Sequence, residues 1–220
     1  MIGERRSVKV LAARLIPGAA RELCEKFGFP PSVCSLALLS TDCDDATYIA
    51  LDEATKKAAV EVVYTHSLYA GAANASTALA GEVIGILGAE NPSEAKSGLT
   101  AALAALEQLG FRTADEAGSV VYLAHCVPRT GSFLSGLAHI PTGQALAYLI
   151  APPVEAVVGL DAALKAAEVR LTELYRPPTE TNFAGGLLTG TQSACRAACD
   201  AFAQAVCAVA ANPREAGFRA

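Results

Sequence analysis

The chain has 220 residues, of which 52% are hydrophobic and only 18% are charged, and its formal net charge at pH 7 is -5. This balance supplies apolar surface for a core and for contacts between subunits, and without a basic run it excludes a nucleic-acid surface, which needs clustered Lys and Arg. No apolar segment has the length and freedom from charge of a membrane-spanning helix, and the sequence "MIGERRSVKV" lacks the apolar core of a signal peptide, so we expect a cytosolic protein with no membrane partner.

The first half of the chain predicts two strands, a helix, two more strands and a second helix. Strand-like runs begin at Ser7 and Ser35, an Ala-rich run over residues 51–59 has helical periodicity, and residues 60–64 are rich in β-branched side chains. The sequence "GEVIGILG" predicts the fourth strand, and Asn91-Pro92-Ser93 predicts the start of the second helix. Between the last two strands lies "SLYAGAANAST", residues 67–77, a loop of small residues with one tyrosine.

The second half repeats these elements in the same order. "SVKVLAARLI" matches "SVVYLAHCVP", and "ALDEATKKAAVEV" matches "GLDAALKAAEVRL", which pairs Leu51 and Asp52 with Leu160 and Asp161 and predicts a helix over residues 160–168. A helix is predicted to begin at "GTQS", and the loop "RPPTETNFAGG", residues 176–186, again holds one aromatic residue. Two tandem copies of one domain explain the pattern, and we assign them to residues 1–112 and 113–220.

The predicted fold class is α+β, an α/β sandwich in which each copy has a mainly antiparallel sheet with helices on one face. If three chains assembled around an axis, the two equivalent loops of each chain would alternate and give six related segments round one centre. Small side chains would let the backbones approach that centre without closing it. The small-residue loops are therefore predicted to line a pore.

Several stretches also resemble a known family. The sequences "SLYAGAANAST", "DCDDATYIALDEATK", "RTGSFLS", "LAYLIAPPVEA", "PPTETNFAGGLLTG" and "QSACRAACDAF" are similar to the tandem-domain shell proteins of the ethanolamine-utilisation bacterial microcompartment, over about residues 35–213. The resemblance implies that each half is a circularly permuted shell domain and that three chains form a pseudo-hexameric homotrimer. It further implies a structural, non-enzymatic tile that packs with other shell proteins in a hexagonal sheet.

The resemblance also implies a gated central pore for small metabolites or cofactors such as cobalamin, and a crevice that binds ethanolamine. The gate residues that it implies are Ser67, Tyr69, Ala70, Gly71, Asn74, Thr181, Asn182, Phe183, Ala184 and Gly185. The ethanolamine-binding residues that it implies are Asp44, Asp45, Glu82, Glu155 and Phe111. Pro128 stands where a serine is expected, and Phe133 stands where a tyrosine is expected, so any hydrogen bond from the tyrosine hydroxyl is absent.

The residues themselves leave two interpretations open for the acidic cluster "STDCDDATY". Asp42, Asp44 and Asp45 are typical of a turn, where an aspartate bonds its own backbone. Alternatively, one or two of these carboxylates face a small cation, because an ammonium that enters a partly dry crevice needs carboxylate or carbonyl partners. Arg129, beside a Gly-Ser turn, is either an anion contact or a surface salt bridge.

The cysteines and histidines predict no metal site, catalytic site or resident cofactor. Seven cysteines without a paired pattern indicate reduced, buried thiols. Cys195 and Cys199 share a helical face and could contact a metal ion, but no CxxC motif or neighbouring histidine completes four ligands. His125 and Cys126 are adjacent in a strand, so they point to opposite faces and cannot easily pair. The rival to the shell tile is a cytosolic module that binds a small amine without assembling.

Overall fold

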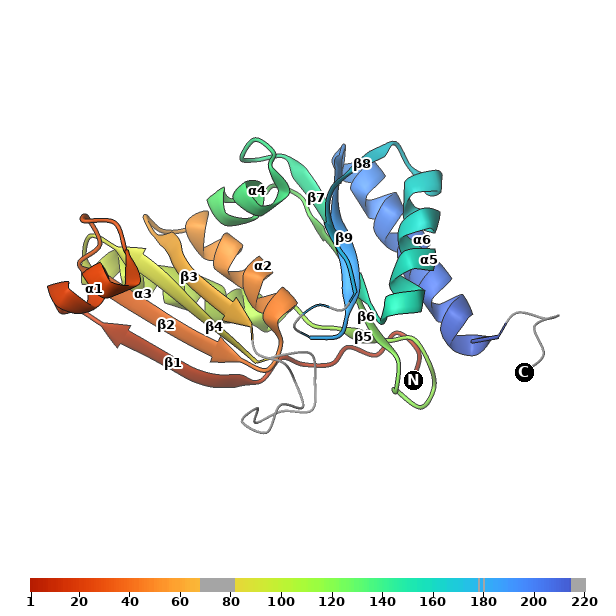
Figure 1. Ribbon diagram of the computed structural model, residues 1–220, viewed down its shortest axis with the longest axis horizontal. Coiled ribbons are helices and arrows are strands. Elements are labelled where there is room, and N and C mark those ends of the chain that lie inside the picture. The colour runs from red at the N-terminus through yellow and green to blue at the C-terminus, as the bar shows by residue number, and fades with distance from the viewer. Residues whose placement is uncertain (68–81, 178, 180, 215–220) are drawn as a thin grey trace. The chain divides into compact units, whose positions relative to one another are not determined.

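The structure is a computed structural model that describes residues 1–67, 82–177, 179 and 181–214 (Figure 1). The chain divides into two compact units. We call Ser7–Gly110 with Thr130–Leu137 the N-terminal unit, and Met1–Arg6 with Phe111–Arg129 and Ala138–Ala220 the C-terminal unit. Each unit thus holds one predicted repeat and a short segment from the other. The assigned repeat boundaries, 1–112 and 113–220, stay a prediction, because compactness does not test where a repeat begins.

The N-terminal unit contains a four-stranded antiparallel sheet in the order β1-β2-β4-β3. Its strands are β1 (Val10–Ile16), β2 (Ser35–Thr41), β3 (Glu61–Ser67) and β4 (Val83–Ala89). Its helices are α1 (Arg21–Phe27), α2 (Asp44–Thr55), α3 (Pro92–Leu106) and most of α4 (Ser132–Ala138). Helices α2 and α3 pack on one face of the sheet, and a small cluster around Cys24 of α1 packs on Leu36 and Ile86.

The C-terminal unit contains a five-stranded antiparallel sheet in the order β5-β6-β7-β9-β8. Its strands are β5 (Arg112–Thr113), β6 (Val121–Val127), β7 (Ala145–Ala151), β8 (Val169–Tyr175) and β9 (Ala184–Gly190). Helices α5 (Pro153–Ala166) and α6 (Gln192–Ala211) lie side by side on one face of this sheet (Figure 1). The order β6-β7-β9-β8 repeats β1-β2-β4-β3, and the predicted α+β class with antiparallel sheets is confirmed.

Small side chains permit the close packing of helices and sheet in the C-terminal unit. In the C-terminal unit the core contains Ala147 and Leu149 of β7 against Ala156 and Ala163 of α5. A Cβ atom on Gly159 would lie 2.7 Å from the ring of Phe202, so only glycine permits this approach of α5 to α6. The Ala-rich periodicity of the sequence therefore reports helices that pack tightly against a sheet.

Local signals explain where two of the long helices begin. The side chain of Asn91 accepts a hydrogen bond from the backbone N–H of Glu94 at 3.0 Å, and Pro92 occupies the first helical position of α3. Thr191 accepts from the N–H of Ala194 at 3.1 Å and starts α6. Both predicted starts, at Asn91-Pro92-Ser93 and at "GTQS", are confirmed.

The predicted bounds of the other two helices were wrong. A helix was expected over residues 51–59, whereas α2 spans Asp44–Thr55; another was expected over 160–168, whereas α5 spans Pro153–Ala166. Periodicity identified the C-terminal part of each helix but missed the first turns. These contain acidic residues in α2 and Pro153 in α5, both of which favour the start of a helix for reasons other than apolar spacing.

Helix α6 is long and apolar enough to cross a membrane, judged by length and composition alone. The sequence had predicted no such segment. A core helix of a soluble protein passes the same test, and Cys195, Ala198 and Phe202 of α6 are buried in the core of the C-terminal unit. The 28% of that window that is buried accounts for part of its apolar composition, and one such helix alone is weak evidence of a membrane span.

Candidate functional site

Four buried carboxylates lie at one end of the sheet in the N-terminal unit. Thr41 at the end of β2 pairs with Val83 at the start of β4, so the next residues in register, Asp42 and Glu82, adjoin each other at the sheet end. Cys43 separates Asp42 from Asp44 and Asp45, which lie in the first turn of α2. All four side chains are at most 9% exposed. Of the predicted ethanolamine-binding residues, the structure thus brings Asp44, Asp45 and Glu82 to one region.

The backbone around this acidic end uses some of the carboxylate oxygens. Asp42 Oδ1 accepts a hydrogen bond from the N–H of Lys9 at 2.7 Å, and the N–H of Asp42 donates to the carbonyl of Lys9 at 3.2 Å. Asp44 Oδ1 accepts from the N–H of Asp45 at 2.9 Å. Asp42 therefore extends the pairing of β2 with β1 by one residue, through its hydrogen bonds with Lys9. Asp44 accepts a hydrogen bond from the neighbouring backbone, as the turn interpretation expects.

The pKa of the Cys43 thiol is shifted by the burial and the negative charge of this region. Burial raises its pKa well above the ordinary value, and the carboxylates of Asp45, Asp44 and Asp42 raise it further, in that order. A thiolate is disfavoured here because the surroundings are both dry and negative. The same surroundings favour a positive charge that can donate hydrogen bonds to the carboxylates.

Hydroxyl groups complete the hydrogen bonding beside the carboxylates. Thr47 donates to the carbonyl of Cys43 at 2.8 Å, and Thr41 and Thr47 share a hydrogen bond of 2.7 Å. The hydroxyl of Tyr48 on α2 bonds to that of Ser67, the last residue of β3. The sequence did not predict the contact of Tyr48 with Ser67, because the two residues are 19 positions apart and come together only when α2 packs beside β3.

The other two predicted ethanolamine-binding residues belong to the C-terminal unit. Glu155 lies in the first turn of α5 and is partly exposed. Phe111 is buried, and its ring lies 5.4 Å from that of Phe183 in an edge-to-face arrangement. The predicted set is therefore divided between the two units, and its joint role stays a prediction.

The predicted gate falls partly outside the described residues. Tyr69, Ala70, Gly71 and Asn74 lie outside them, whereas Ser67 ends β3 and pairs with Val83. In the second loop, Thr181 is buried, Asn182 has a positive φ of 62° and Phe183 packs on Phe111.

The second small-residue loop is shorter than predicted. It was expected over residues 176–186, but Ala184 and Gly185 are already part of β9, where they pair with Ala151 and Ile150 of β7. A Cβ atom on Gly185 would lie 1.9 Å from the carbonyl oxygen of Leu149. Glycine is thus needed at this position for the close approach of two strands.

The remaining candidates lie apart from the acidic end. Arg129 is exposed, and its predicted anion contact stays a prediction. Cys195 and Cys199 are buried on α6, and burial is the main cause that raises both pKa values, with Cys126 adding to it. The buried-thiol interpretation is confirmed for these two residues. Across the described ranges, no group of three or more His, Cys, Asp or Glu side chains could hold a metal ion.

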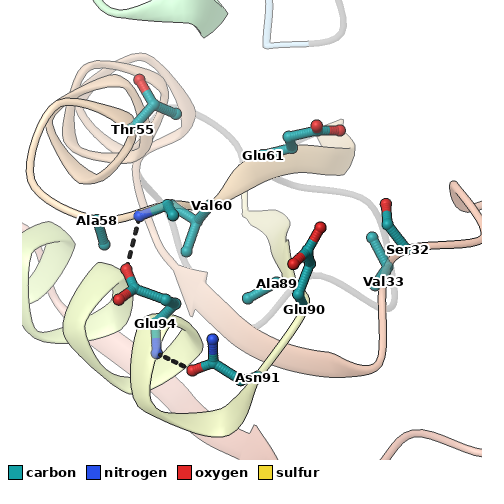
Figure 2. Close-up of a pocket in the computed structure, with 12 residues that line it drawn as sticks. Ser32, Val33, Thr55, Ala58, Val60, Glu61, Ala89, Glu90, Asn91 and Glu94 are labelled. Carbon is teal, nitrogen blue, oxygen red and sulfur yellow. Dashed lines mark hydrogen bonds between the residues drawn. The ribbon is translucent and has the colours of Figure 1, made fainter.

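A separate pocket of about 420 Å³ lies in the N-terminal unit, between the end of α2 and the start of α3 (Figure 2). Its lining includes the carboxylates of Glu61, Glu90 and Glu94 but none of the predicted site residues. Figure 2 shows Glu94 directed at the turn after α2, where its carboxylate accepts the N–H of Ala59 at 2.7 Å. Glu94 therefore connects α3 to that turn.

Comparison with known proteins identifies the fold as that of the bacterial microcompartment shell proteins. No protein-family model matches the chain. A crystal structure of the trimeric bacterial microcompartment shell protein PduB matches with a TM-score of 0.75 at 20% identity, covering 92% of this chain and 89% of that one. This similarity defines the class of protein by its fold.

Two further relatives define the family. The chain is 58% identical over 205 residues to the bacterial microcompartment shell protein EutL of Clostridium perfringens, which covers 93% of this chain and 94% of that protein. The crystal structure of the ethanolamine utilization protein EutL from Leptotrichia buccalis has a TM-score of 0.93 and 57% identity, covering 98% of this chain and 100% of that one. The chain belongs to the EutL family of bacterial microcompartment shell proteins. The predicted resemblance and the predicted shell location are confirmed.

Proposed function

We propose that three copies of this chain form a pseudo-hexameric tile in the shell of an ethanolamine-utilisation microcompartment. The tile packs with other shell proteins in a hexagonal sheet, has a gated pore at its centre and catalyses no reaction. The pore passes a small metabolite or a cofactor such as cobalamin. The names of the relatives, which are shell proteins associated with ethanolamine utilization, support this proposal.

The observation that carries the proposal is the repeated topology of the two units. Each has the same antiparallel order, β1-β2-β4-β3 in one and β6-β7-β9-β8 in the other, and the small-residue loops join equivalent strands, β3 to β4 and β8 to β9. A trimer of such chains presents six equivalent loops, which suits a pore on the axis of a six-fold tile.

The acidic end of the N-terminal unit supports an ethanolamine-binding role. Ethanolamine is an ammonium ion near neutral pH, and Asp44, Asp45 and Glu82 offer buried carboxylates that can accept hydrogen bonds from it. Glu155 and Phe111, the other two residues of the proposed set, belong to the C-terminal unit. The same acidic end also favours the second candidate function, a cytosolic module that binds a small amine without assembling.

Native mass spectrometry and negative-stain electron microscopy of the purified protein test the tile. The expected result is a mass of three chains and hexagonally packed sheets at high protein concentration. A monomer or dimer that forms no sheets at any concentration overturns the tile and favours the amine-binding module.

Calorimetric titration with ethanolamine tests the crevice. Substitution Asp45→Asn keeps the shape of the side chain but removes its charge, so ethanolamine affinity is expected to fall on the order of tenfold or more, as for loss of one charge-assisted hydrogen bond. The control is Glu61→Gln, which neutralises an exposed carboxylate in the other pocket. Equal affinity of wild type and Asp45→Asn would rule out the crevice.

A further inference from the structure

Helix α2 packs against a segment from the other repeat, residues Thr130–Leu137, which lies in the N-terminal unit. The carboxylate of Asp52 accepts hydrogen bonds from the backbone N–H groups of Gly131 at 2.7 Å and Leu134 at 2.8 Å. The ring of Tyr48 lies 5.9 Å from that of Phe133. Asp52 and Leu134 are both fully buried, so this face of α2 is covered by the α4 segment.

The same face of α5, the equivalent helix in the second repeat, is uncovered. Asp161 corresponds to Asp52, and counting three residues back from each aspartate pairs Val158 with Ile49. Ile49 is 1% exposed, whereas Val158 is 44% exposed. The other exposed apolar side chains on α5 are Val154, Val157 and Leu164. With Val158 they form an apolar stripe at helical spacing, which we call the α5 stripe.

The segment equivalent to α4 in the first repeat is α1, which buries Cys24 in the core of its unit but leaves two apolar side chains exposed. Both helices have seven residues, follow the first long strand of their repeat and have leucine at the third position. Leu134 of α4 is 0% exposed, whereas Leu23 of α1 is 42% exposed. Phe27, the last residue of α1, is 45% exposed, although one part of its ring stacks on Phe29 at 4.9 Å and meets Tyr64 at 5.5 Å. The contact surfaces of α2 and the α4 segment are thus buried within the chain. The equivalent surfaces in the other repeat, on α5 and α1, are exposed.

We propose that the α5 stripe of one copy is covered by α1 of a second copy, with Leu23 and Phe27 seated on Val157 and Val158. The contact repeats between chains the packing that α2 and the α4 segment make within one chain. It rests on the homotrimer proposed above and names the surfaces that hold it together.

The two surfaces suit each other in chemistry and in symmetry. Each contains exposed apolar side chains, and each also carries one exposed ion pair, Arg21 with Glu25 on α1 and Asp161 with Lys165 on α5. Because the two surfaces differ, the contact is head-to-tail. Head-to-tail contacts form a closed ring when the rotation from one copy to the next is a whole fraction of a full turn. Ala20 stands where the α4 segment has Gly131, at which a Cβ atom would lie 2.2 Å from Thr55 Oγ1, so we expect α1 to lie farther from α5 than the α4 segment lies from α2.

Substitution Val157→Asp tests the proposal by native mass spectrometry and analytical ultracentrifugation. A charge buried without a partner in each contact is expected to raise the trimer dissociation constant on the order of 100-fold or more. The matched control is Val10→Asp, which puts the same charge on an exposed valine of β1. The control variant is expected to remain a trimer.

The double variant Val157→Asp with Leu23→Lys gives a sharper result. Opposite charges then meet across the contact, so the trimer is expected to re-form. Leu23→Asp alone is expected to dissociate the trimer as Val157→Asp does, and it covers the case in which Val157→Asp fails to fold. A wild-type protein that is not a trimer would overturn the proposed function. A wild-type trimer that persists in both single-aspartate variants would overturn only the α1–α5 contact.

Discussion

Substitution of Asp52 by alanine is predicted to destabilise the protein strongly. The side chain is fully buried in α2, and its two oxygens accept the N–H groups of Gly131 and Leu134. Lys56 Nζ lies 3.4 Å from Asp52 and also pairs with Glu53. Removing Asp52 thus leaves two buried N–H donors without their acceptor, while Lys56 retains a partner.

The size of the effect follows from these contacts. A hydrogen bond to a charged group contributes about 1.5 to 3 kcal/mol, so the loss of two predicts a decrease of about 3 to 6 kcal/mol in the free energy of unfolding. With a urea m-value of about 2 kcal/mol/M, the midpoint of unfolding falls by about 1.5 to 3 M. Urea unfolding must be followed at one fixed protomer concentration, because assembly adds to the apparent stability.

Glu53→Gln is the matched control for Asp52→Ala. Glu53 is the next residue of α2 and shares Lys56 as its partner, but its side chain is 32% exposed. Its loss is expected to cost less than about 1 kcal/mol, as for a surface ion pair. If the free energies of unfolding of Asp52→Ala and Glu53→Gln differ by less than about 1 kcal/mol, Asp52 does not hold the α4 segment and the reasoning is wrong.

Two further predictions concern a close backbone contact and an exposed carboxylate. Gly185→Ala would place a Cβ atom 1.9 Å from a backbone oxygen of β7, so this variant is expected to have a markedly lower melting temperature in a calorimetric scan. The control is Gly136→Ala, whose Cβ atom would have no neighbour within 4 Å, and it should melt at or above the wild-type temperature. Hydrogen bonds, first that from the hydroxyl of Ser119, lower the pKa of Asp115 below its ordinary 3.8. The stability that Asp115 contributes is therefore complete above pH 3.8 and lost as the pH falls through the lower folded-state pKa. A carboxyl NMR titration with a midpoint at or above 3.8 would contradict this.

The sequence predicted the repeated elements because their signals are local. Caps at Asn91 and Thr191, β-branched runs and Ala-rich periodicity depend on neighbouring residues, and the structure has the elements that they indicate. The first turn of α2 was missed because Asp44 and Asp45 carry no apolar periodicity. Their role in starting a helix is electrostatic, and it competes with the turn that the same residues favour.

The candidate site was predictable only where sequence neighbours remain spatial neighbours. Asp44 and Asp45 are adjacent in the chain, and Glu82 joins them because β2 and β4 are paired in a register that no local pattern reveals. The contacts of Asp52 with Gly131 and Leu134 were missed for the same reason. The partners of Asp52 lie in the other repeat. An aspartate in a helix is also compatible with an exposed position, and its counterpart Asp161 is exposed.

The contrast between Asp52 and Asp161 also explains why two copies of one domain have different surfaces. The contact of α2 with the α4 segment forms within one chain, so it costs no translational or rotational freedom of association, and a polar face with well-placed hydrogen bonds is sufficient. A contact made by α5 with another chain must offset that cost, and buried apolar area is the most direct source of the free energy. Three residues of the α5 stripe, Val154, Val157 and Leu164, stand where α2 has Asp45, Tyr48 and Thr55, whereas Val158 corresponds to the apolar Ile49. Replacing the stripe by the residues of α2 should therefore weaken assembly while leaving the fold of each unit intact.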